Sequence, residues 1–142
     1  MLLYKSIKKT QLGILSLLFI TGIAYADSIG DIVESTGVSQ IVRNNEEIKV
    51  SKQIPIELND EAKTGNGRML IEFLDKAQLS LKEHSEVLID EIYYDPDPSL
   101  SKMSMKFTMG TARFASGRLG LVNKANIDIK KDKFLVDLLL KF

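Results

Sequence analysis

Apolar and polar residues alternate along much of this chain, as they do in β-strands that have one buried face. The clearest case lies at 103–109, where Met103, Met105, Phe107 and Met109 alternate with polar residues. Because successive side chains of a strand point to opposite faces of a sheet, one face of this segment is predicted to be core and the other solvent-exposed. Similar runs predict further strands at 29–34, 38–43, 69–73, 77–81, 87–94 and 125–129.

Turn residues separate these runs. The Asn-Asn pair at 44–45 suits a two-residue hairpin, because Asn tolerates the left-handed region better than most residues do. Gly-Asn-Gly at 65–67 predicts a tight turn, and Asp-Lys at 75–76 predicts the connection of a hairpin. Pro55 restricts its segment to an edge or a link, since proline cannot donate to an interior ladder. Two prolines predict a loop at 95–99.

Short strands joined by tight turns predict an all-β fold, in which neighbours in sequence pair antiparallel. Two architectures fit, an antiparallel twisted sandwich and a short β-solenoid, and periodicity does not separate them because both place alternate residues inside. Residues 131–142 lose the alternation and are predicted to be disordered or loosely attached, which would leave the edge at 125–129 open to another strand. A truncated or frame-shifted domain explains such a tail, and so does the terminal helix or strand of a naturally short variant.

The first 26 residues have the pattern of a secretory signal peptide. Three lysines and no acidic residue precede an apolar core at 12–23, which is shorter than the ~20 residues of a membrane span. The small residues of Ala-Tyr-Ala at 24–26 suit signal peptidase, so cleavage is predicted between Ala26 and Asp27. We therefore expect a periplasmic or secreted protein with no membrane span after cleavage. The alternative is an uncleaved N-terminal anchor.

Charge and cysteine content restrict the kinds of partner, anchor and covalent cross-link that are expected. The chain has 19 basic and 19 acidic residues, and without the three lysines of the leader 16 basic residues face 19 acidic ones, a net charge of about −3. This balance argues against a nucleic-acid partner, which would require a basic face. The chain has no cysteine, so neither a lipoprotein anchor nor a disulfide is expected, and stability must come from packing and hydrogen bonds.

A set of short motifs is spread over residues 30 to 117. Its members are Gly30-Asp31-Ile32, Gly37-Val38, Arg43, Thr64-Gly65, Ile71-Glu72-Phe73-Leu74-Asp75, Leu79-Ser80-Leu81, Ser85, and Gly-Thr-Ala-Arg-Phe-Ala-Ser-Gly at 110–117. In this order they resemble the FecR domain, a periplasmic all-β module of iron-dicitrate sensor-like proteins. In that family the last motif turns one long strand back on itself, which would make Gly110 and Gly117 the corners.

The resemblance implies an organisation and a function. Residues 1–26 would be the signal peptide, 27–130 a FecR-like domain and 131–142 an atypical tail. The implied function is a non-catalytic module that binds partners in envelope signalling or iron-transport regulation. An envelope polysaccharide-binding or structural module is the alternative, and an envelope hydrolase is a third class.

Candidate chemistry is sparse, and no catalytic, cofactor or metal site is predicted. His84 is the only imidazole and lies in a polar turn, where a surface position is expected. A catalytic triad would need a carboxylate and an activated nucleophile beside it. Asp90, Glu91, Asp95 and Asp97 could supply oxygen ligands to calcium, but they lack the regular spacing with glycine of calcium loops. A solvated acidic loop is therefore predicted there.

Three residues are predicted as contacts with another envelope protein or polymer. Arg113 could bind a ligand or partner, and the alternative is a salt bridge or a solvated position on a strand. Tyr93 and Tyr94 lie next to the acidic loop and could stack on a sugar ring. The alternative for the two tyrosines is ordinary packing on a sheet, for which aromatic residues are well suited.

Overall fold

The computed structural model describes residues 27–51, 53–132 and 135–142. The signal peptide predicted at 1–26 lies outside the described residues. The elements, in chain order, are β1 (Gly30–Arg43), β2 (Glu46–Lys49), β3 (Pro55–Ile56), β4 (Glu61–Phe73), β5 (Gln78–Leu81), β6 (Glu86–Tyr93), η1 (Pro98–Leu100), β7 (Lys102–Ala115), α1 (Arg118–Val122), η2 (Lys124–Asn126), β8 (Ile127–Lys131) and β9 (Val136–Lys141).

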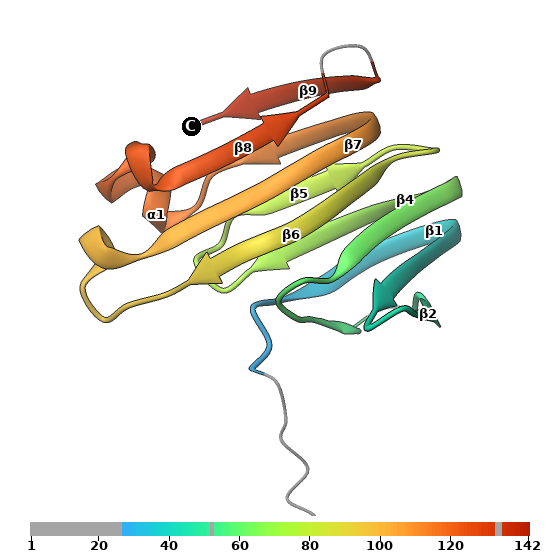
Figure 1. Ribbon diagram of the computed structural model, residues 1–142, viewed down its shortest axis with the longest axis horizontal. Helices are drawn as coiled ribbons and strands as arrows, with labels where there is room; N and C mark the ends of the chain where they lie inside the picture. The colour runs from blue at the N-terminus through green and yellow to red at the C-terminus, as the bar shows by residue number, and fades with distance from the viewer. Residues whose placement is uncertain (1–26, 52, 133–134) are drawn as a thin grey trace, which may run out of the picture.

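The prediction of an all-β protein is confirmed, with 62% of the structure in strands and 10% in helices. The strands form one sheet in the order β2-β1-β4-β5-β7-β6, with β3 paired to β1 and both β8 and β9 paired to β7 (Figure 1). β4 also pairs with β6, which closes β4, β5, β7 and β6 into a small barrel with extra strands at its sides.

The barrel closes because two long strands change partners along their length. The first part of β4 pairs with β6 and its last part with β5. The first part of β7 likewise pairs with β6 and its last part with β5. Between these parts β7 bends sharply, at the right-hand side of Figure 1, where Gly110 adopts a φ of 97°. The bend requires glycine there, because a Cβ at Gly110 would lie 2.6 Å from the carbonyl oxygen of His84.

The tight turn predicted at 65–67 is wrong, because β4 runs straight through these residues. Gly67 lies opposite Gly37 of β1, which has a φ of 68°. A Cβ at Gly67 would lie 2.7 Å from the backbone nitrogen of Val38, so these glycines permit a close approach of two backbones rather than a reversal. The strands predicted at 29–34 and 38–43 are likewise one strand, β1, with register shifts at two irregularities.

Other predicted connections are confirmed. Asn44 and Asn45, with φ values of 51° and 64°, join β1 to β2. Lys76, with a φ of 70°, lies in the turn between β4 and β5. Pro55 lies in the two-residue strand β3, outside the main strand order, as a residue without a backbone donor should.

The alternation predicted at 103–109 is confirmed for three residues and wrong for the fourth. Met103, Met105 and Phe107 are buried, whereas Met109 is 38% exposed. Glu86 of β6 pairs with Met109 while Val87 pairs with Phe107, so one extra residue of β7 lies between them. Such a bulge moves the side chains that follow to the opposite face, and the buried positions become Ala112 and Phe114.

Part of the predicted tail belongs to the sheet. Residues 136–141 form β9, which pairs with β7 from Gly110 to Ala115. Val136 is buried, and the ring of Phe142 contacts that of Phe114 with centroids 6.4 Å apart. For these residues the predicted disorder or loose attachment is wrong.

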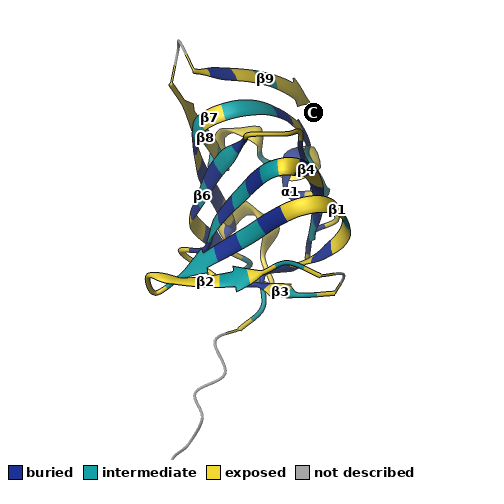
Figure 2. Ribbon diagram, turned by 90° about the vertical axis from the view of Figure 1, so that its right-hand side faces the viewer, coloured by how far each residue is buried: buried dark blue, intermediate teal, exposed yellow. Residues whose placement is uncertain are grey.

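The expected antiparallel pairing is also wrong for β8 and β9, which both run parallel to β7. β8 follows the first half of β7 and β9 follows its second half, so both run along one side of the same bent strand (Figures 1 and 2). Parallel strands need a crossover, and the segment containing α1 and η2 supplies it. This crossover is short because the bend brings the two ends of β7 to the same side of the molecule (Figure 1).

Candidate functional site

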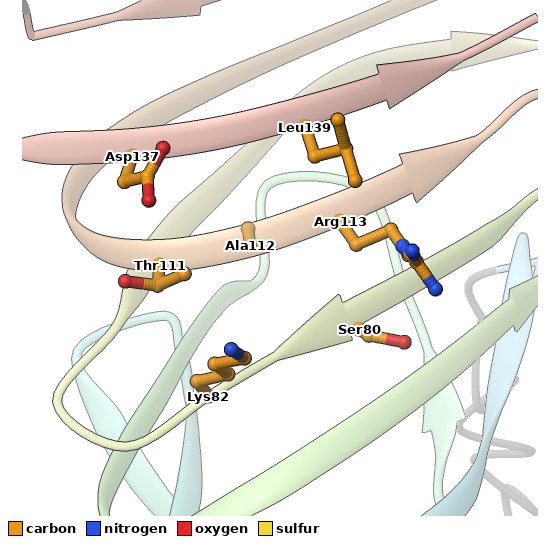
Figure 3. Close-up of a pocket in the computed structure, with 7 residues that line it drawn as sticks. All are labelled: Ser80, Lys82, Thr111, Ala112, Arg113, Asp137 and Leu139. Carbon is orange, nitrogen blue, oxygen red and sulfur yellow. The ribbon is translucent and has the colours of Figure 1, made fainter.

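A hollow of about 420 Å³ lies on the outer face of the sheet where β5, β7 and β9 run side by side (Figure 3). The register places Ser80 opposite Arg113, Arg113 opposite Leu139, and Thr111 opposite Asp137. The lining residues are Ser80, Lys82, Thr111, Ala112, Arg113, Asp137 and Leu139. Sheet pairing therefore brings together side chains from three segments far apart in sequence.

Arg113 is exposed at this hollow. Its side chain extends from β7 over β5, in the direction of Ser80 (Figure 3). Within the described part of the chain, it makes no salt bridge and no side-chain hydrogen bond. Of the two alternatives to a partner contact, the structure thus supports a solvated position on a strand rather than a salt bridge, and the contact itself stays a prediction.

The other lining groups make the hollow chemically mixed. Lys82 adds a second cation that forms no ion pair with any described residue, and Asp137 adds one carboxylate at the β9 side. Ser80 and Thr111 offer hydroxyl groups, and Leu139, 54% exposed, offers an apolar contact. A guanidinium beside hydroxyls can hold a carboxylate or phosphate through two parallel hydrogen bonds.

A buried network of hydroxyl groups fixes the strands beneath the hollow. The Ser85 hydroxyl donates to the Thr111 carbonyl and accepts from the Thr111 backbone N–H, both at 3.0 Å. The Ser85 backbone N–H donates to Oγ1 of Thr64 at 2.9 Å, and that hydroxyl donates to the Lys82 carbonyl at 2.5 Å. The network ties β4 and the β5–β6 turn to β7 at the point where β7 bends, and so positions the backbone of Arg113 two residues further along.

The two tyrosines lie elsewhere and differ from each other. Tyr93 is exposed, and its hydroxyl donates to the Asp95 carboxylate at 2.7 Å, which raises the pKa of Tyr93 and lowers that of Asp95. Tyr94 packs against the core and donates to Oδ1 of Asp75 at 3.2 Å. Burial, with the nearby Asp75 carboxylate, raises the pKa of Tyr94. For Tyr94 this geometry supports ordinary packing, while the ring of Tyr93 is accessible. Neither tyrosine lines the hollow.

Asp75 has a structural role that the sequence pattern did not indicate. Its buried carboxylate accepts hydrogen bonds from the backbone N–H of Ala77 at 3.1 Å, from the Tyr94 hydroxyl, and from the backbone N–H of Leu119 at 3.3 Å. These bonds join the β4–β5 turn, the end of β6 and the start of α1. In the sequence, Asp75 was identified only as a turn residue and as part of a motif that resembles FecR domains.

Arg43 and Asp60 form a second structural cluster. The Asp60 side chain is 0% exposed and accepts hydrogen bonds from Nε and Nη2 of Arg43, both at 2.8 Å. Nη1 of Arg43 also pairs with the Glu57 carboxylate at 2.8 Å. The hydrogen bond with Asp60 outweighs the effect of burial and raises the pKa of Arg43. This arginine therefore stabilises the fold and is not available as a surface contact.

The remaining candidates show no assembled chemistry. His84 is exposed in the turn after β5, where its backbone N–H donates to the Gly65 carbonyl. Asp97 accepts from the backbone and side chain of Ser99, as the cap of η1. Among residues 27–51, 53–132 and 135–142, no three His, Cys, Asp or Glu side chains are grouped so that they could hold a metal ion. No helix in the described part of the chain has the length and apolar character needed to cross a membrane.

Comparison with known proteins adds no relative. No family model, no curated protein and no solved structure matches this chain. The resemblance to FecR domains therefore rests on the short motifs.

Proposed function

We propose that this protein is a non-catalytic, FecR-like module of the periplasm, or a secreted one, that binds another envelope protein or polymer through the hollow around Arg113. The observation that carries the proposal is the exposed pair of cations, Arg113 and Lys82, which form no ion pair with any described residue and lie beside two hydroxyl groups. The signal-peptide pattern at 1–26 supports the compartment.

The physical basis of binding is a preorganised set of donors on a rigid sheet. The buried hydroxyl network fixes the backbone of β7 at Thr111. Ligand binding therefore costs little conformational entropy of the backbone there. A hydrogen bond to a charged group contributes about 1.5–3 kcal/mol. The ligand chemistry that fits is an anionic group, a carboxylate or a phosphate, carried by a protein or by a polymer.

The motif positions support the FecR-like part of the proposal. Thr64 and Ser85 come from two separate motifs of the resemblance, and they contact each other in the buried network. Gly110 begins a third motif and lies at the bend of β7, where the resemblance implies a corner. The bent long strands also favour a sandwich over a solenoid as the finer description of the sheet.

A sugar-binding role is the second candidate, and the accessible ring of Tyr93 favours it. Exposed aromatic rings stack on sugar faces, and the adjacent Asp95 carboxylate could accept hydrogen bonds from sugar hydroxyls. This candidate uses a different surface from the hollow, so variants can separate the two. An envelope hydrolase is not proposed, because no described carboxylate or hydroxyl side chain forms a hydrogen bond with His84.

The test is a binding assay with purified protein against cell-wall glycans and against the plug domains of outer-membrane receptors. Arg113→Ala should weaken binding about tenfold or more, since 1.4 kcal/mol corresponds to a factor of ten. Arg118→Ala is the matched control, because Arg118 is also exposed but lies on α1 outside the hollow. The proposal fails if neither ligand binds, or if both variants bind as the parent does. A loss confined to Tyr93→Ala would favour the sugar-binding candidate.

A further inference from the structure

The outer edge of β9 differs from the other edges of the sheet. β9 pairs with β7 on one side and with no other described strand. It carries three successive leucines, of which Leu139 is exposed by 54% and Leu140 by 42%. By contrast, β2 has the sequence Glu-Glu-Ile-Lys, and β8 has Ile-Asp-Ile-Lys-Lys. Charged residues on edge strands prevent the addition of further strands, and β9 has few of them.

The backbone of β9 determines which groups are free to pair. The Leu135 and Lys141 carbonyls accept hydrogen bonds from Gly110 and Ser116, both at 2.8 Å. In a parallel ladder the residues of a strand alternate in the side to which their N–H and C=O groups point. The odd-numbered residues of β9 therefore face β7, and the even-numbered residues, such as Leu138 and Leu140, point their backbone groups to the open edge.

We propose that a second copy of this chain occupies the edge, with β9 pairing antiparallel to β9 about a two-fold axis at Leu139. In this register Leu139 faces itself, Leu138 faces Leu140 of the second copy, and Asp137 faces Lys141. The even-numbered residues then form the hydrogen-bonded pairs, which agrees with the direction of their free backbone groups. The sequence of β9 is self-complementary in this arrangement alone. A shift of two residues either way places Lys141 opposite a leucine, Leu135 or Leu139.

A second copy would also cover apolar surface that the monomer leaves half-buried. Ile129 and Leu138 pack against the core and remain partly exposed, and the Phe142 ring is half exposed. The pairing is isologous, as in most symmetric dimers, and continues the sheet from one copy into the other. The two-fold axis is perpendicular to the sheet, so both Arg113 hollows would open on the same face. Asp137 and Leu139 also line the hollow, but self-association is measured without a ligand, so either proposal can fail without the other.

A cysteine cross-link tests the register, because the chain has no cysteine of its own. Residues directly opposite in a non-hydrogen-bonded antiparallel pair have Cα atoms about 4.5 Å apart, within the range that a disulfide bridges. Leu139→Cys should therefore form a disulfide-linked dimer under mild oxidation. Leu121→Cys is the control, since Leu121 is 86% exposed and lies on α1, outside the proposed pairing of β9 with β9. Equal dimer yields for the two variants would overturn the proposed register.

A charge exchange tests the pairing without a covalent bond. Asp137→Lys places two lysines opposite each other and should raise the dimer dissociation constant about tenfold or more in sedimentation velocity. Adding Lys141→Asp to Asp137→Lys reverses the pair and should restore the affinity. Circular dichroism verifies that each variant is folded. A parent protein that stays monomeric to millimolar concentration, or a double variant that is not restored, would contradict the proposal. If the protein is monomeric, the strand that pairs with the edge of β9 would have to come from another protein.

Discussion

Replacing Arg43 by methionine should destabilise the protein strongly, because it leaves a charge buried without its partner. The Asp60 side chain is 0% exposed and would lose two hydrogen bonds of 2.8 Å, keeping the one from the backbone N–H of Glu57. Breaking a buried ion pair by removing one partner costs about 3–5 kcal/mol. The Arg43 side chain is 20% exposed, so water reaches part of the site and we expect the lower end, about 3 kcal/mol. The free energy of unfolding of a native protein is about 5–15 kcal/mol in total, so this loss would be a large part of it.

Urea unfolding followed by circular dichroism measures this loss, and two further variants separate its causes. Arg68→Met removes an exposed pair with Glu83, with side chains 65% and 45% exposed, and should change the free energy of unfolding only slightly. Combining Arg43→Met with Asp60→Leu removes the buried charge as well, and should leave the protein more stable than Arg43→Met alone. If Arg43→Met costs no more than Arg68→Met, the burial argument is refuted.

Three other predictions concern the core, the bend and the response to pH. Phe107→Asp buries an unpaired charge and should abolish cooperative thermal unfolding, whereas a variant that melts like the parent would place that face outside. Gly110→Ala should destabilise by more than about 1 kcal/mol in urea, because φ is 97° and the methyl group meets His84, while Gly65→Ala, with its nearest atom at 3.6 Å, should cost less. Because the pKa of Tyr94 is raised above its usual 10.0, the contribution of Tyr94 to the free energy of unfolding should be constant below pH 10 and should be lost as the pH rises further. In urea titrations at several pH values, Tyr94→Phe should show a smaller fall of the free energy of unfolding above pH 10 than the parent does. An equal fall in the variant and the parent would be evidence against this role of Tyr94.

Sequence patterns correctly predicted those elements whose structure depends mainly on residues close together in the chain. The period of two predicted the buried residues of the first half of β7, and the Asn pair predicted the β1–β2 hairpin. The same logic failed at 65–67, because a glycine that permits a close backbone approach looks the same in sequence as one that makes a turn. It also failed at Met109, because a bulge depends on the register of the neighbouring strand.

Features that depend on distant segments could not be predicted. The tail lacked a clear period, yet β9 forms because β7 bends and offers a second length of edge to pair with. Asp60 and Asp75 look like turn residues in sequence, and only the fold brings their partners to them. Alternation after the bulge is enough to place Arg113 outside, but Lys82 and Asp137 join it only through the pairing of β5, β7 and β9.

The most direct test of the proposed binding surface is an NMR titration of the purified protein with cell-wall glycans and with a receptor plug domain. Binding at the hollow should shift the backbone amide signals of 80–82, 111–113 and 137–139, with smaller changes elsewhere. Arg113→Ala should suppress those shifts, and Arg118→Ala should not. Shifts that cluster around Tyr93 instead, or no shifts with either ligand, would contradict the account.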